Sequence, residues 1–188
     1  MTDDFGLEEI RALLAELGRR LAARGVDGDI RIVGGAAIAF TGSTRRRTKD
    51  IDASYAHPAE VEAVAREMAA EYGLPSDWIN SSATAWIPPG ATWLEVDLDA
   101  PIHARAASAE TLLAMKLSAG RDRDLLDIQY LAQRLEVGPE EAARIAEDQY
   151  GDDDVAYTRA DREDAVLIVQ EAIGMPAPDP PPMMGDAG

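Results

Sequence analysis

Two acidic residues, Asp50 and Asp52, stand two positions apart in a short segment that is typical of a β-strand. Side chains alternate along a strand, so both carboxylates point to one face while Ile51 points to the other. Like charges this close repel each other unless a cation lies between them, and Mg²⁺ (or Mn²⁺), which also holds nucleotide phosphates, is the natural candidate. Gly34 and Gly35 close an earlier predicted strand and would let the backbone approach those phosphates.

Both pairs also have simpler structural explanations. Gly34-Gly35 suits a tight turn from a strand into a helix, and Asp50 with Asp52 suits the solvated face of a strand. Three consecutive arginines, 45–47, directly precede the acidic pair. They indicate a local basic patch beside the carboxylates, and this favours a metal and phosphate site over both alternatives.

A single lysine interrupts the apolar run 112–117, which is predicted to be helical. A charged side chain without a partner would be costly there, so Lys116 either pairs with an acidic group or extends its stem to solvent. Asp124 and Asp127 follow one helical turn apart and share a face. Their simplest explanation is a surface salt bridge with Arg121 or Arg123.

Composition limits the classes of protein that fit. The 188 residues suffice for one domain with a sizeable core, and the absence of cysteine excludes disulfides and a thiolate nucleophile. No apolar stretch is long enough to span a bilayer and residues 1–4 do not begin a secretory signal, so we expect a cytoplasmic protein without a membrane partner. A net charge of -17 argues against a general nucleic-acid-coating protein.

Hydrophobic periodicity predicts an α/β (α+β) chain with a small mixed sheet and a helical C-terminal half. The domain would span 1–174, with its helical part from about residue 108, before a proline-rich, disordered tail over 175–188. Ser108 and Asp122 are predicted helix N-caps. The expected strands and helices are, in chain order, helix 7–24, strand 29–33, a short helix, strand 50–53, helix 59–72, strand 93–99, and helices from 108, 122, 139 and about 160.

The segment 73–91 is predicted to be irregular, with Trp78, Ile79 and Trp86 buried. The strand predicted to follow it alternates strictly and carries an acidic face of Glu95, Asp97 and Asp99. An exposed sheet edge explains that face without any ligand.

Four segments together resemble the AbiEii/MenT-like nucleotidyltransferases of the DNA polymerase β-type superfamily, with the shorter DUF6036 branch the most similar. They are 33–37, 46–52, 112–117 and 121–128, and the resemblance spans roughly residues 7–135. It implies the polymerase β-type nucleotidyltransferase fold. It also implies metal-dependent transfer of a nucleoside monophosphate from a nucleoside triphosphate to an acceptor.

The resemblance carries over to particular residues. Asp50 and Asp52 would bind the metal, with Asp97 or Asp99 as a third carboxylate from a neighbouring strand. Lys116 would be an active-site lysine and Asp124, rather than Asp127, an active-site carboxylate. The expected nucleotide-binding residues are Gly34, Gly35, Arg46 and Thr48, the last lying two positions before Asp50.

The implied acceptor is the 3′ end of a tRNA, which would make the protein the toxin of a toxin–antitoxin pair with a cognate antitoxin. Two alternatives stay open. One is transfer of the nucleotide to a protein side chain, and the other is a nucleotide-binding module without catalysis.

Overall fold

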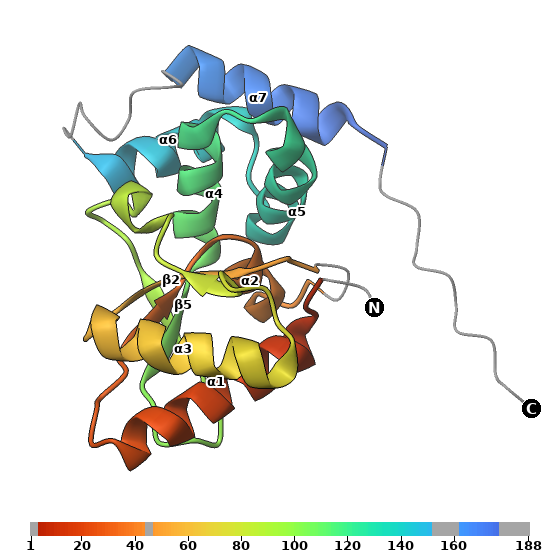
Figure 1. Ribbon diagram of the computed structural model, residues 1–188. Coiled ribbons are helices and arrows are strands. Elements are labelled where there is room, and N and C mark those ends of the chain that lie inside the picture. Colours follow the sequence, from red (N-terminus) through yellow and green to blue (C-terminus); the bar gives the residue numbers. More distant parts are fainter. Residues whose placement is uncertain (1–3, 44–46, 152–161, 177–188) are drawn as a thin grey trace, which may run out of the picture.

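A five-stranded mixed sheet lies between two groups of helices in the computed structural model, which describes residues 4–43, 47–151 and 162–176 (Figure 1). The strand order is β3-β2-β1-β5-β4. Central β1 pairs antiparallel with β2 and parallel with β5. The strands are β1 (Ile30–Ile32), β2 (Ile51–Tyr55), β3 (Ile79–Asn80), β4 (Trp93–Glu95) and β5 (Ala104–Ala107).

Two long helices, α1 (Leu7–Ala23) and α3 (Pro58–Tyr72), pack against each other on one side of the sheet (Figure 1). Apolar residues spaced by three or four positions, including Ile10, Leu14 and Leu17, are fully buried along α1. The predicted helix is therefore confirmed, and its role is to support the sheet.

The C-terminal half is helical, as predicted, and packs on the opposite side of the sheet from α1 and α3 (Figure 1). Short α2 (Gly34–Phe40) contacts β2, β5 and α4, and so connects the sheet to this half. The four helices of this half are α4 (Ala109–Ala119), α5 (Leu125–Leu135), α6 (Pro139–Tyr150) and α7 (Arg162–Gly174). None of the helices in the described ranges is both long and apolar enough to cross a membrane.

Both ends of α4 lie at residues whose types favour helix ends. The Ser108 side chain accepts a hydrogen bond from the Thr111 amide, and Gly120 ends the helix with a φ of 54°. The prediction for Asp122 was wrong, because a 3₁₀ turn, η2 (Asp122–Asp124), precedes α5 and no side-chain cap forms there. Of the predicted tail, residues 177–188 lie outside the described residues.

The predicted strand 93–99 is shorter in the structure and ends at Glu95. The backbone turns directly afterwards, because the Asp97 carboxylate accepts a hydrogen bond from the Asp99 amide (3.1 Å) and Asp99 has a φ of 49°. Such a local bond competes with strand pairing. Trp86 also differs from the prediction, because its side chain is 48% exposed while Trp78 is fully buried.

Candidate active site

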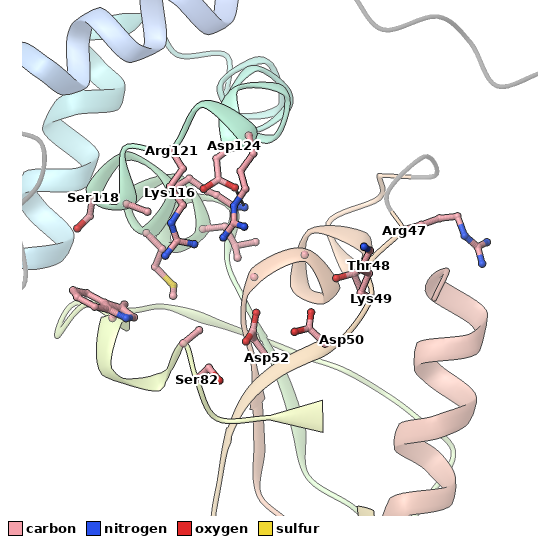
Figure 2. Close-up of a pocket in the computed structure, with 18 of the residues that line it drawn as sticks. Arg47, Thr48, Lys49, Asp50, Asp52, Ser82, Lys116, Ser118, Arg121 and Asp124 are labelled. Carbon is pink, nitrogen blue, oxygen red and sulfur yellow. Dashed lines mark hydrogen bonds and ion pairs between the residues drawn. The ribbon is translucent and has the colours of Figure 1, made fainter. Parts of the chain in front are cut away.

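A cavity of about 820 Å³ lies where the sheet meets the helical half (Figure 2). This volume falls within the roughly 300–1,000 Å³ of small-molecule sites. Its wall includes five cationic and four anionic side chains, although the whole chain carries a net charge of -17. These are Arg47, Lys49, Lys116, Arg121 and Arg123, and Asp4, Asp50, Asp52 and Asp124. The described cavity wall therefore carries one more cationic than anionic side chain, and it includes both lysines of the chain.

Asp50 and Asp52 both line the cavity. Asp52 lies on β2, while Asp50 stands one position before the strand, where its carboxylate accepts a hydrogen bond from the side-chain Nδ2 of Asn80 (3.2 Å). Burial and the neighbouring Asp50 charge raise the pKa of Asp52 to about 6, against the opposing effect of Lys116 and Arg121. The two carboxylates thus repel each other, and a divalent cation would relieve that repulsion.

Gly34 lies directly beside the Asp52 carboxylate. The Val33 amide donates to the Asp52 carbonyl (2.9 Å), and this strand pairing brings the following glycine next to the acid. Gly34 has a φ of 64°, and a Cβ there would lie 2.9 Å from Asp52 Oδ2. Position 34 therefore requires glycine for both its backbone conformation and its lack of a side chain.

Lys116 reaches the cavity from α4 and forms ion pairs with two acidic residues of the next helical segment. Its Nζ contacts Asp124 Oδ1 and lies 2.9 Å from Asp127 Oδ2. Asp124 is 5% and Asp127 7% exposed. The acidic pairing predicted for Lys116 is therefore present, and the two acids form a buried cluster with the lysine rather than a surface salt bridge with Arg121 or Arg123.

Arg121 and Arg123 line the cavity, yet neither forms an ion pair within 4 Å of any residue that the structure describes. Figure 2 shows Arg121 beside Lys116 on the helical side, across the cavity from Asp50 and Asp52. Salt bridges to Asp124 or Asp127 were one role that the sequence suggested for these arginines, and no such pair forms. Their position directly after Gly120, the end of an apolar helix, was the available signal that they face the same site as Lys116.

The predicted third carboxylate, Asp97 or Asp99, does not line the cavity. Because β4 is antiparallel to β5, the chain after Glu95 runs toward the end of the sheet where β1 and β5 begin, whereas Gly34 follows the other end of β1. Among the described residues, no group of three or more Asp, Glu, His or Cys side chains is placed to hold a metal.

Two other predicted nucleotide-binding residues precede Asp50 in the sequence. Arg46 is outside the described residues. Thr48 lines the cavity and is 8% exposed, but it pairs with Phe5 in an isolated bridge before the strand. Because Thr48 precedes β2, the alternation of side chains along that strand does not decide where its hydroxyl points. Gly35 also lines the cavity, at the first turn of α2.

Comparison with known protein families gives one match. The family model described as "Nucleotidyltransferase of unknown function (DUF6036)" matches residues 8–150, which include every described residue of the cavity except Asp4. No curated protein and no solved structure matches the chain.

Proposed function

The chain belongs to the DUF6036 family of nucleotidyltransferases, and we propose that its cavity binds a nucleoside triphosphate with a divalent cation and transfers the nucleoside monophosphate to an acceptor hydroxyl. One observation carries this proposal. The carboxylates of Asp50 and Asp52, the latter with Gly34 against it, face Arg121 and Lys116 across one cavity, and Arg123 also lines it.

The residues fit Mg²⁺ or Mn²⁺. Mg²⁺ is commonly held by one or two carboxylates together with substrate phosphates, so two aspartates suffice without a third protein carboxylate. Asp50 and Asp52 would hold the ion. When bound, it supplies positive charge to the phosphates and to the reacting oxygens.

The side chains of the protein would bind the triphosphate and stabilise the leaving group. Arg121 and Arg123 are free to neutralise phosphate charge, whereas Lys116 already pairs with two acids and would share its charge with them. The acceptor oxygen forms a bond to the α-phosphorus, the bond from this phosphorus to the bridging oxygen breaks, and pyrophosphate leaves. The acceptor proton is released to water.

Labelled triphosphate tests the chemistry. Wild-type protein incubated with α-³²P nucleoside triphosphates, MgCl₂ and a cell lysate should transfer label to a macromolecule. Asp50→Ala and Asp52→Ala should abolish that transfer while the protein stays folded, because the changes remove metal ligands and not core packing. Wild-type activity in either variant would contradict the assignment of the two carboxylates.

For the acceptor we propose the 3′ end of a tRNA, and for the biological role a toxin with a cognate antitoxin partner. The resemblance to AbiEii/MenT-like enzymes supports both, and the exposed Lys49 at the cavity wall supplies a cation for an RNA backbone. Incubation with purified tRNA separates the possibilities. Label in the tRNA band supports this acceptor, whereas label only in a protein band of the lysate contradicts it.

A further inference from the structure

The chain leaves one large aromatic side chain exposed inside the candidate site. Six large hydrophobic residues in the described ranges are exposed, and of these only Trp86 lines the cavity. A tryptophan offers one of the largest apolar surfaces of any residue, and burial of that surface is favourable. Trp86 is 48% exposed and lines this cavity, so its indole is available to a ligand with a flat apolar face.

The backbone that carries Trp86 is firmly attached to the helical half. Trp86 ends a 3₁₀ turn, η1 (Thr84–Trp86), and its carbonyl accepts a hydrogen bond from the hydroxyl of buried Tyr150 on α6 (2.9 Å). Four residues later, the Gly90 amide donates to the Gln149 carbonyl (2.8 Å). The indole is thus presented by an anchored turn.

On α4, the helix that carries Lys116, apolar side chains also lie next to this cationic side chain. Leu112, Met115, Lys116 and Ala119 of α4 follow helical i, i+3, i+4, i+7 spacing and all line the cavity. One helix face therefore offers an apolar surface immediately next to the lysine. A ligand that joins a flat apolar group to a polyanion would match this arrangement, with the apolar group on the apolar surface and the polyanion near the lysine.

We propose that Trp86 is the stacking platform for the nucleobase of the nucleoside triphosphate, with Met115 and Ala119 completing the apolar part of its site. The inference rests on the proposed function, because it assigns the base end of the same substrate. Stacking on an indole tolerates every base, since each has a π-face. Trp86 should therefore contribute to the affinity for all four triphosphates to a similar degree.

Calorimetric titration at fixed MgCl₂ tests the platform by comparing the four nucleoside triphosphates with inorganic tripolyphosphate, which has no base. Trp86→Leu, which keeps an apolar side chain without a π-face, should weaken nucleotide binding about tenfold and leave tripolyphosphate binding within twofold. Trp86→Phe should stay close to wild type. Trp93→Leu is the matched control, because Trp93 lies on β4 and does not line the cavity.

The outcomes separate the two proposals. If wild-type protein binds no nucleoside triphosphate, both fail. If it binds the nucleotides and Trp86→Leu binds them equally well, only the stacking platform is wrong, and equal weakening toward nucleotides and tripolyphosphate would show a structural role instead.

A second measurement leaves Trp86 unchanged. In a Trp93→Phe protein the remaining tryptophans are Trp86 and fully buried Trp78. Nucleotides should quench the emission and tripolyphosphate should not. Equal effects of the two ligands would overturn the inference.

Discussion

The ionised carboxylate of Asp52 lowers the free energy of unfolding of the metal-free protein, and the proposed cation would remove this destabilisation. Its pKa is raised to about 6 by burial and by Asp50, so folding is most favourable when the carboxyl group is protonated. This contribution to stability is complete below the unfolded-state pKa, near 4, and is lost as the pH rises through about 6.

We therefore predict that Asp52→Asn stabilises the metal-free protein at pH 8 but not at pH 4. The gain should be about 1 kcal/mol in the free energy of unfolding after allowance for partial exposure. Urea unfolding at both pH values measures this gain, with the exposed Asp27→Asn as control.

Addition of MgCl₂ at pH 8 should then stabilise wild type but not Asp52→Asn. Equal stabilisation of both proteins would argue against a metal at Asp52.

Gly34 provides a second prediction, for which the chain contains a matched control. Gly25 has nearly the same left-handed φ, 69°, but a Cβ there would meet nothing within 4 Å. Gly34→Ala and Gly25→Ala should both lose about 1 kcal/mol of stability from backbone strain. Only Gly34→Ala should also weaken binding of the Mg²⁺–nucleotide complex, because its methyl group displaces the Asp52 carboxylate. Similar affinities for the two variants would show that this contact has no part in binding.

At the scale of elements, the cluster of Lys116, Asp124 and Asp127 joins α4 to the turn and helix that follow it. Removal of one partner from a buried ion pair leaves charge uncompensated, and this typically costs about 3–5 kcal/mol. We therefore expect the cluster to stabilise the part of the helical half that lines the cavity.

We predict that Lys116→Met lowers the free energy of unfolding by about 3 kcal/mol and transfer activity at least about tenfold. Combining it with Asp124→Asn and Asp127→Asn should restore much of the stability but none of the activity, because the charge needed by the substrate stays absent. Chemical unfolding and the labelled-transfer assay measure the two effects.

Lys49→Met is the control, because Lys49 is the only other lysine of the chain and is exposed. This substitution should change the free energy of unfolding by less than about 0.5 kcal/mol. An unchanged stability in Lys116→Met would mean that the buried pairs contribute nothing.

Local sequence patterns predicted the helices better than they predicted contacts between residues that are far apart in the chain. Apolar spacing and the cap at Ser108 predicted helices, because these signals lie within one element. The direction of the chain after Glu95 depends on the pairing of β4 with β5, which alternation along one strand does not show. The resemblance suggested Asp97 or Asp99 as a third carboxylate, and neither lines the cavity. Trp86 was predicted buried from residue type alone, which cannot show that a cavity lies beside it.

At the scale of the whole molecule, the charges have an uneven distribution that the sequence only partly indicated. The chain carries -17, yet cationic side chains outnumber anionic ones around the cavity. Uneven spacing of the arginines along the sequence suggested a local basic patch, and Arg121 and Arg123 line the cavity because they directly follow the end of α4. Charges more than about 10 Å apart are screened at moderate salt, so the local cations should decide phosphate binding despite the total charge.

The last prediction separates the local charges from the total charge. Arg121→Ala and Arg134→Ala each remove one positive charge and so change the net charge equally, from -17 to -18. Arg121 lines the cavity, whereas Arg134 is exposed on α5 and does not. Arg121→Ala should weaken Mg²⁺–nucleotide binding about tenfold at 0.15 M salt, since a charge-assisted contact to phosphate is lost, and Arg134→Ala should bind as wild type does. Titration calorimetry measures both, and equal weakening would mean that the overall field of the protein, and not this arginine, governs the approach of the triphosphate.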